Sequence, residues 1–251
     1  MNGLIKHIDY NKLKNSLKDE IINLWGKFNV YHIYNVPEMD YISMYENLAE
    51  SLGEIRICHS ANNKDTPFSK SRDIKPDPNL YHYFSSNSRQ PLHTDYAYYE
   101  SKESPEWIMI YCLEKSEWGG KTHLLSTDTL KKILSKYKPE LLEKIKIDVF
   151  WKYNGLDGDK IHKKPILDGK RINWNYWQIK EELNTKETIE IRDEFFNFLE
   201  NYISGGGIFD FSKKWTRGDC IIFNDTLNLH GRDAFLGDER WLKDHAFYNK
   251  K

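Results

Sequence analysis

The sequence predicts an α+β fold in which helices flank an antiparallel β core of the double-stranded β-helix, or jelly-roll, type. Apolar residues recur at helical spacing in several segments. Short apolar runs bounded by glycine or turn residues dominate the last third of the chain. The chain has 251 residues, of which 39% are hydrophobic. That length permits one large core, so we expect residues 1–251 to form a single domain.

The expected helices follow from this spacing and from the residues at their ends. Leu13, Leu17 and Ile21 begin an apolar series that predicts a helix from Asn11 to Phe28. Four more helices are expected from the same pattern together with capping or breaking residues. They are Tyr41–Leu52 with Gly53 as C-cap, Thr129–Tyr137 with Asp128 as N-cap, Pro139–Lys146, and Thr188–Ile203 ended by Gly205–Gly207.

The expected strands are short apolar runs between turn signals. They are Val30–Tyr34, Trp107–Leu113, a strand that follows Gly119-Gly120 and runs through Leu125, Gly207–Phe211, Asp219–Phe223, and Arg240–Tyr248. Residues Ser60–Pro78 are polar, aperiodic and contain proline, so they predict a loop. Because long loops in compact domains often form lids, we expect this one to be a mobile segment near the mouth of a site.

Charge and cysteine content narrow the possible partners and compartment. The formal net charge is −1, so no overall field favours nucleic acid or an anionic membrane. The first ten residues lack the apolar region of a signal peptide, and no stretch is apolar enough to span a bilayer. Cys58, Cys112 and Cys220 are too few and too far apart for a disulfide framework. We therefore expect a cytoplasmic protein with a small-molecule substrate.

The sequence His93-Thr94-Asp95, followed much later by His230 and Arg240, is the strongest functional signal. Residues two apart on a strand face the same side, so His93 and Asp95 can reach one metal. Two imidazoles and one carboxylate are the ligand set of a non-haem Fe(II) oxygenase, which leaves positions open for a co-substrate and O2. By itself, His-x-Asp more often marks a polar surface, so the flanking residues decide.

The flanking motifs carry a resemblance to a known family. They are Gln90-Pro-Leu-His-Thr-Asp95, Gly119-Gly-Lys-Thr122, Gly218-Asp-Cys-Ile-Ile-Phe-Asn224 and Leu229-His-Gly-Arg232, followed by Arg240. In that order they closely resemble the taurine dioxygenase and clavaminate synthase-like family of Fe(II)/2-oxoglutarate oxygenases. The resemblance extends over nearly the whole chain, from Glu46–Glu54 to His230–Phe235.

The resemblance implies roles for individual residues. His93, Asp95 and His230 would bind iron, and Thr122 with Arg240 would hold the distal carboxylate of 2-oxoglutarate. An arginine suits that task because its planar fork matches a carboxylate. Halogenating relatives carry Ala or Gly where this chain has Asp95, so the chain resembles the hydroxylases.

Two features of the motifs leave their roles open. Relatives often read Asp-Asn where this chain has Asn224-Asp225, a departure that suggests a supporting or structural role. Arg232 either forms an ion pair that steadies the ligand loop or acts directly at the site.

The substrate side is less clear. Tyr96 directly follows the metal residues, and Trp174 with Asn175 lies in a segment that mixes rings and amides. These residues suit a pocket wall, although an aromatic core is the alternative. Asp244 shares a strand face with Arg240, at a position where relatives often carry arginine. A carboxylate there favours a cationic or amine-bearing substrate, unless it pairs with Lys243 or Arg171.

Together these inferences predict an Fe(II)/2-oxoglutarate-dependent dioxygenase, an oxidoreductase that hydroxylates an unactivated C–H bond and releases succinate and CO2. The expected substrate is an amino acid or an amino-acid-derived metabolite of secondary metabolism, either free or tethered to a carrier. Desaturation, cyclisation and oxidative decarboxylation on the same scaffold remain alternatives.

A nucleic-acid demethylase is less favoured because the chain lacks a basic stripe. A non-catalytic jelly-roll binding protein is less favoured because all five ligand-type residues are present. The oligomeric state is left open.

Overall fold

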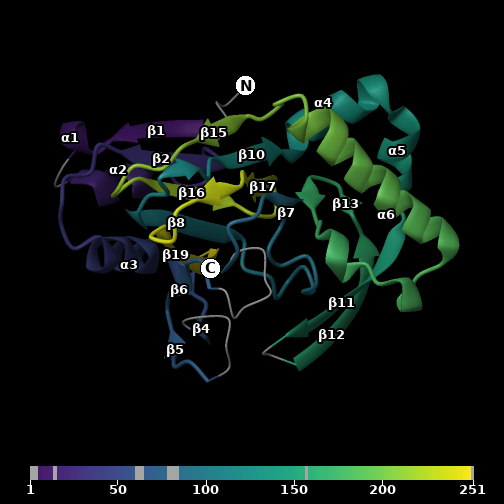
Figure 1. The fold of residues 1–251 in the computed structure, drawn as a ribbon, viewed down its shortest axis with the longest axis horizontal. Coiled ribbons are helices and arrows are strands. Elements are labelled where there is room, and N and C mark those ends of the chain that lie inside the picture. Colours follow the sequence, from purple (N-terminus) through teal and green to yellow (C-terminus); the bar gives the residue numbers. More distant parts are fainter. Residues whose placement is uncertain (1–4, 14–15, 60–64, 78–84, 156–157, 250–251) are drawn as a thin grey trace.

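The computed structural model describes residues 5–13, 16–59, 65–77, 85–155 and 158–249, and most of its strands form two sheets (Figure 1). The larger sheet has the order β1-β2-β16-β8-β19-β3, and β6 also pairs with β19. Its strands are β1 (Ile5–Asp9), β2 (Val30–Tyr34), β16 (Cys220–Asn224), β8 (Trp107–Glu114), β19 (Trp241–Asn249), β3 (Gly53–Ile55) and β6 (Arg72–Ile74). The smaller sheet has the order β15-β10-β17-β7. It consists of β15 (Phe211–Lys213), β10 (Thr122–Ser126), β17 (Asn228–Arg232) and β7 (Gln90–His93).

The remaining described elements are four strand pairs and the helices. The strand pairs are β11 (Asp148–Gly155) with β12 (Gly158–Pro165), β13 (Leu167–Asp168) with β14 (Arg171–Ile172), β9 (Trp118–Gly119) with β18 (Phe235–Leu236), and β4 (Cys58–His59) with β5 (Phe68–Ser69). The α-helices are α1 (Tyr10–Leu13), α2 (Leu17–Leu24), α3 (Tyr41–Leu52), α4 (Thr127–Tyr137), α5 (Pro139–Lys144) and α6 (Lys186–Phe198). Short 3-10 helices η3 (Tyr176–Gln178) and η4 (Glu181–Leu183) precede α6, and the π-helix η5 (Leu199–Ser204) extends it.

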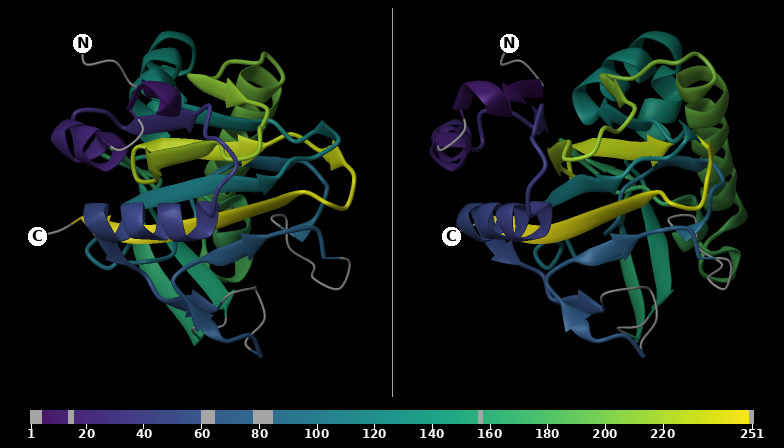
Figure 2. Two further views of the ribbon diagram at one scale, coloured as in Figure 1. Left: turned by 90° about the vertical axis from the view of Figure 1, so that its left-hand side faces the viewer. Right: turned by 60° about the vertical axis from the view of Figure 1, so that its left-hand side comes forward.

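Strand β8 explains how the layers stack. Its alternate residues Ile108 and Ile110 belong to the core shared with the smaller sheet, where Leu124 and Leu229 also lie. The intervening residue Met109 belongs to a second core, which α2 and α3 complete. This alternation is the period-2 signature of a strand buried on both faces. The larger sheet therefore lies between the smaller sheet and the N-terminal helices (Figure 2).

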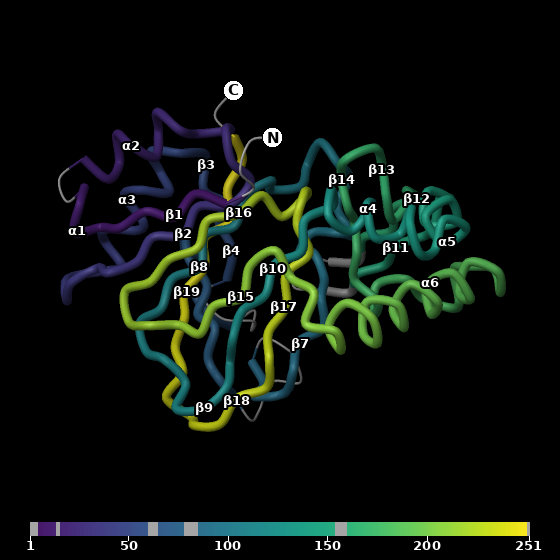
Figure 3. Tube along the Cα trace, turned by 90° about the horizontal axis from the view of Figure 1, so that it is seen from above, coloured from purple at the N-terminus to yellow at the C-terminus, as the bar shows by residue number. Residues whose placement is uncertain are grey.

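Helices α4, α5 and α6 gather beyond one end of the two sheets (Figure 3). Their buried residues Leu130, Leu141 and Phe195 belong to the same core as the sheet residues. No helix among the described residues has the length and apolar character that crossing a membrane requires. The mixture of packed helices and sheets confirms the α+β class.

The helix predictions were correct in place but often wrong at the ends. The single helix predicted over Asn11–Phe28 corresponds to two helices, α1 and α2, and residues 14–15 lie outside the described residues. Helix α2 ends at Leu24, and Gly26 has a φ of 75°. Helix α4 is capped by Ser126, whose side chain accepts a hydrogen bond from the Thr129 N–H at 3.1 Å, and Asp128 lies in the first turn. The last predicted helix begins earlier, at Lys186, and its final turns are π-helical.

The strand predictions for β2, β8, β16 and β19 are confirmed, although β19 begins one residue after Arg240. A strand over Gly207–Phe211 was wrong, because β15 begins only at Phe211. Of the predicted loop Ser60–Pro78, residues 60–64 and 78 lie outside the described residues. The described part contains β5 and β6, and β6 joins the larger sheet next to the site. The hairpin of β11 and β12 was not predicted.

Candidate metal centre and co-substrate pocket

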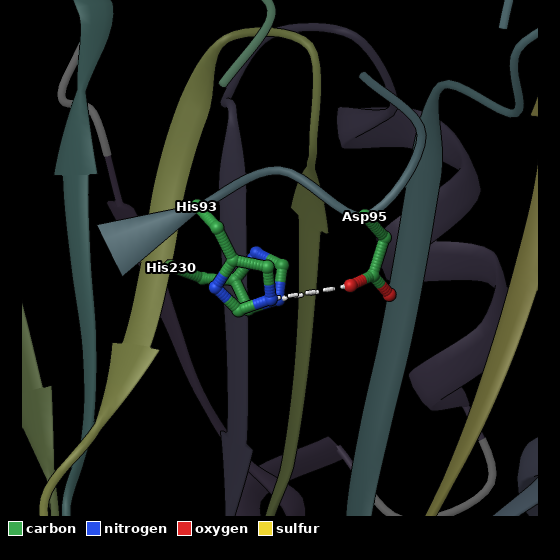
Figure 4. A group of neighbouring side chains, drawn as sticks. All are labelled: His93, Asp95 and His230. Atoms are coloured by element: carbon green, nitrogen blue, oxygen red, sulfur yellow. Dashed lines mark ion pairs between the residues drawn. The ribbon is translucent and has the colours of Figure 1, made fainter. Parts of the chain in front are cut away.

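The structure brings His93, Asp95 and His230 together between the two sheets (Figure 4). His93 ends β7, and His230 lies directly opposite it on β17. The Oδ1 atom of Asp95 is 3.3 Å from Nε2 of His93 and 3.6 Å from Nε2 of His230. One potential ligand atom from each residue lies within 4.8 Å of the other two. This spacing is small enough for one metal ion to contact all three side chains.

The route by which Asp95 reaches the centre differs from the prediction. Strand β7 ends at His93, so Asp95 does not share a strand face with it. The Thr94 N–H instead donates to the Trp174 carbonyl at 2.6 Å, and the chain turns. The backbone N–H of Asp95 then donates to Oδ2 of Asp225 at 3.0 Å. The turn, rather than strand alternation, brings the carboxylate back toward the histidines.

Both imidazoles have an oxygen close to Nδ1, in a hydrogen bond at His93 and in an ion-pair contact at His230. His93 Nδ1 lies 2.9 Å from the Pro91 carbonyl oxygen, and His230 Nδ1 lies 3.1 Å from Oδ1 of Asp225. When Nδ1 carries the proton, Nε2 is left with its lone pair facing the centre. At His93 that lone pair faces the side-chain amide of Gln90 at 3.1 Å, a contact that a metal ion would displace.

Asp225 thus contacts two of the three residues at once, His230 through Oδ1 and Asp95 through Oδ2. The sequence drew attention to Asn224-Asp225 without assigning a role. Asn224 has a local structural role. Its Oδ1 accepts a hydrogen bond from the Thr226 N–H at 3.0 Å, which stabilises the turn between β16 and β17.

Burial and charge make this cluster suitable for a cation. Burial by itself raises the pKa of Asp95, but hydrogen bonds from His230 and His93 and the charge of Arg72 outweigh it and hold that pKa well below its usual range. Burial would lower the pKa of His230, but its contacts with Asp225 and Asp95 raise it to about 10. Burial raises the pKa of Asp225. The carboxylates therefore hold a proton on His230 at neutral pH, a positive charge that a divalent metal could replace.

Arg240 lines the same cavity as Asp95 and His230, and it is only 3% exposed. Its Nε and Nη1 atoms have no hydrogen-bond partner among the described residues. Burial, aided by the charge of Arg232, lowers its pKa to about 9. The Phe235 ring lies 5.0 Å from the guanidinium carbon. Leaving two buried guanidinium nitrogens without hydrogen bonds is costly, so the environment of Arg240 suits a bound anion.

Thr122 also lines this cavity. Its Oγ1 accepts a hydrogen bond from the indole N–H of Trp215 at 2.8 Å, which leaves the hydroxyl proton available to donate. Arg232 lies opposite Thr122 across the β10–β17 pair. Its Nη2 donates to the carbonyls of Ser86 and Ser88 at 2.8 and 2.6 Å, so it fixes the approach to β7 while lining the cavity.

The predicted substrate-side residues are distributed differently. Trp174 is fully buried and packs edge-to-face on Phe195 at 4.6 Å, so its ring belongs to the core rather than to the cavity. Asn175 is half-buried, begins η3 and is not among the cavity-lining residues. Tyr96 is also absent from the cavity lining. It is 8% exposed and follows Asp95 in the chain, with the Arg56 guanidinium 5.5 Å from its ring centre.

Asp244 does face the cavity, but it has a positive partner within the protein. Arg72 Nη2 lies 2.5 Å from Oδ2 of Asp244, and Arg72 Nε lies 3.2 Å from the same atom. The expectation that Asp244 needs a cationic group of the substrate therefore loses its basis. The sequence does not single out Arg72, because this residue lies on the short strand β6 inside a polar segment.

Comparison with known proteins agrees with this geometry. Residues 3–244 match the family described as the taurine catabolism dioxygenase TauD, TfdA family. The chain belongs to this dioxygenase family. The resemblance seen in the motifs around His93 and His230 is thereby confirmed.

One curated relative and two solved structures illustrate the range of the family. The chain is 24% identical over 185 residues to 3-((Z)-2-isocyanoethenyl)-1H-indole synthase of Fischerella ambigua (strain UTEX 1903). The match covers 67% of this chain and 66% of the relative, so it spans slightly under two thirds of the relative's length. Asparagine oxygenase, solved with Fe(II), 2S,3S-3-hydroxyasparagine and succinate, has a TM-score of 0.69 at 14% identity over 94% of this chain and 79% of the other. PvcB, an Fe, alpha-ketoglutarate dependent oxygenase from an isonitrile synthetic pathway, has a TM-score of 0.58 at 16% identity over 97% of this chain and 82% of the other. These structures share the fold.

Proposed function

We propose that this protein is an Fe(II)/2-oxoglutarate-dependent dioxygenase that hydroxylates an unactivated C–H bond of an amino acid or an amino-acid-derived small molecule. The observation that carries the proposal is one cavity that holds both halves of the required apparatus. Asp95 and His230 line this cavity, and their ligand atoms lie within 4.8 Å of a ligand atom of His93. The cavity is also lined by Arg240, a buried cation whose Nε and Nη1 lack partners among the described residues.

In this proposal His93, Asp95 and His230 bind the metal. Iron, with 2-oxoglutarate and O2, supplies the oxidising chemistry when bound. The protein fixes the geometry beforehand, because Pro91 and Asp225 hold the two imidazoles with their Nε2 atoms facing Asp95. His93 and His230 are 5% and 7% exposed, so bulk water has little access to the two imidazoles.

Arg240 and Thr122 then anchor the distal carboxylate of 2-oxoglutarate. Arg240 offers a charge-assisted fork, and the Thr122 hydroxyl donates while its oxygen remains bonded to Trp215. The co-substrate also supplies a negative charge, which buried Arg240 does not receive from an ion pair among the described residues. Its other end would face the triad, since His230 and Asp95 line the same cavity.

The substrate class rests on the relatives together with Tyr96. Asparagine oxygenase was solved with a hydroxylated amino acid, and the Fischerella relative makes a substituted indole. Tyr96 follows Asp95 directly and is the predicted wall residue nearest the triad in the chain. We keep Tyr96 as a proposed substrate contact. The structure gives no support for a cationic substrate through Asp244, which is already paired with Arg72.

A second outcome on the same scaffold is favoured by one observation. The Fischerella relative is named as the synthase of an isocyanoethenyl product, which contains a carbon–carbon double bond. Desaturation or oxidative decarboxylation of an amino-acid-derived substrate is therefore the alternative to hydroxylation. Product analysis separates them, because hydroxylation adds an oxygen atom and desaturation removes hydrogen.

The test is succinate release from 2-oxoglutarate by protein reconstituted with Fe(II), assayed with a panel of amino acids and their N-substituted derivatives. We expect one or more of them to stimulate succinate formation and to be oxidised in parallel. His230→Ala should abolish both signals, whereas His7→Ala, a histidine on β1 of the larger sheet, should retain them. Equal, background-level turnover in wild type and His230→Ala would exclude the proposed reaction.

The finer points of the fold are also proposed. The two sheets are proposed to form a double-stranded β-helix and residues 1–251 a single domain, which the core shared by both sheets supports. A cytoplasmic location is supported by three free cysteines, of which Cys112 and Cys220 are buried.

A further inference from the structure

Arg72 connects the triad to Asp244 by a direct chain of contacts. Its Nη2 atom lies 3.3 Å from Oδ2 of Asp95 and 2.5 Å from Oδ2 of Asp244. Arg72 and Asp244 are directly opposite each other in the antiparallel pair of β6 and β19. The Asp244 side chain is 7% exposed and that of Arg72 22%, so bulk water screens the contact only partly.

The two oxygens of Asp95 consequently face different groups. Oδ1 faces the Nε2 atoms of His93 and His230, where a metal ion would sit. Oδ2 faces Arg72. A carboxylate held in this way presents one oxygen to the metal rather than two. That choice matters, because a carboxylate that chelates with both oxygens occupies a coordination position that a co-substrate or O2 requires.

A guanidinium beside a metal-binding carboxylate also creates a difficulty. Its positive charge competes with the metal ion for the same carboxylate and repels the ion. Asp244 removes this difficulty, because its carboxylate neutralises Arg72 at the closest contact of the group. The pair can then orient Asp95 without adding net charge to the site.

We propose that Arg72 is a positioning residue that directs one oxygen of Asp95 toward the metal, and that Asp244 is its counter-charge. The inference rests on the proposed function, because it assumes a metal at the triad. It assigns Asp244 to the support of the metal centre rather than to substrate recognition. It also gives β6 a role in the centre, although that strand lies outside the sequence motifs.

A simple structural pairing of β6 with β19 is the competing explanation, and the same strands provide its control. Next to the Asp244–Arg72 pair on the same two strands, Lys243 lies directly opposite Asp73. The Lys243 Nζ atom is 3.0 Å from Oδ1 of Asp73. Successive residues on a strand point to opposite faces, so this pair faces away from the triad. Loss of either ion pair should weaken the strand pairing, but only loss of the Arg72–Asp244 pair should alter the metal site.

The experiment titrates metal-free protein with Co(II), whose visible absorption reports both binding and coordination geometry. Wild type is compared with Arg72→Gln, Asp244→Asn, the double variant and the control Asp73→Asn, and thermal unfolding of each metal-free protein checks that it is folded. We expect Asp244→Asn to weaken Co(II) binding about tenfold or more, because Arg72 then loses the carboxylate at its closest contact and competes more strongly with the metal for Asp95. Arg72→Gln should bind Co(II) at least as tightly as wild type but with an altered spectrum, because Oδ2 of Asp95 is released.

The double variant should bind more tightly than Asp244→Asn while keeping the altered spectrum, and Asp73→Asn should match wild type in both. If Arg72→Gln does not fold, Arg72→Lys retains the charge, loses the fork and should still alter the spectrum. Unchanged affinity and spectrum in both Arg72→Gln and Asp244→Asn would overturn the inference in favour of simple strand pairing. A different result would contradict the proposed function itself: wild type would then bind Co(II) no more tightly than His230→Ala.

Discussion

Arg240→Met should make the protein more stable and remove its response to 2-oxoglutarate. Arg240 is 3% exposed, and its Nε and Nη1 atoms have no hydrogen-bond partner among the described residues. Burial and the charge of Arg232 lower its pKa to about 9. Folding therefore disfavours the charged form, with the full penalty present below about pH 9 and relieved as the pH rises above that value. Methionine replaces the guanidinium with an apolar group of similar length.

The size of the effect follows from that pKa. Each tenfold change in proton affinity corresponds to about 1.4 kcal/mol, so the penalty on the charged form amounts to a few kcal/mol. Relaxation of the site and lost contacts of the arginine stem reduce the gain, so we expect a net stabilisation of about 1–3 kcal/mol. For a chain of this size each kcal/mol raises the Tm by roughly 2–4 °C. In wild type, 2-oxoglutarate at about 100 times its Kd should add about 2.7 kcal/mol of stability, which the variant should lack.

The assay is thermal unfolding followed by tryptophan fluorescence, with Co(II) present and oxygen excluded, with and without 2-oxoglutarate. Arg192→Met is the matched control. Arg192 is also buried, but its Nη1 donates to the Ile179 carbonyl at 3.0 Å and its Nε contacts Asp193. That variant should lose stability and keep the response to 2-oxoglutarate. A fall in the Tm of Arg240→Met, or a normal response to 2-oxoglutarate in that variant, would refute the assignment of Arg240 as the anchor.

Three further outcomes are expected. Asp225→Asn should weaken Co(II) binding by about 10- to 100-fold in a calorimetric titration, because Asp225 orients both His230 and Asp95; unchanged affinity would remove that role. Thr122→Val should raise the KM for 2-oxoglutarate by about two- to tenfold with little change in kcat, since one hydrogen bond is lost; a kcat effect alone would contradict it. Burial, with the charges of Lys213 and His7, lowers the pKa of His32 to about 4, so folding disfavours its protonated form. Stability should fall as the pH drops from about 6.5 toward 4, and His32→Gln should reduce that fall, as urea unfolding at several pH values will show; identical pH profiles would exclude His32.

The convergence of His93, Asp95 and His230 could be predicted from the sequence because each lies in a recognisable local motif. His93 and Asp95 are two residues apart, and each histidine sits in a motif of adjacent residues. The Arg72 contact could not be predicted in the same way, since 172 residues separate Arg72 from Asp244. Only the pairing of β6 with β19 brings them together, and β6 lies within a segment whose polar composition indicates a loop.

The errors in the fold have similarly specific causes. In the β11–β12 hairpin, Val149 and Trp151 are buried, but the outward-facing Phe150 and Ile161 are apolar too, being 38% and 50% exposed. These residues conceal the alternation that identifies a strand. The position of Trp174 could not be predicted for a similar reason. A tryptophan near a predicted pocket has the same sequence signature whether its ring lines the pocket or belongs to the core.

The turn that carries Asp225 has a consequence for engineering this protein. The chain leaves the larger sheet at Asn224 and enters the smaller sheet at Asn228, so residues 225–227 form the crossover between sheets. The same short segment holds His230 and Asp95 through one carboxylate. An insertion there would change the crossover and the metal support together, whereas the β11–β12 hairpin belongs to neither sheet. Loop exchange between relatives should therefore fail at this crossover.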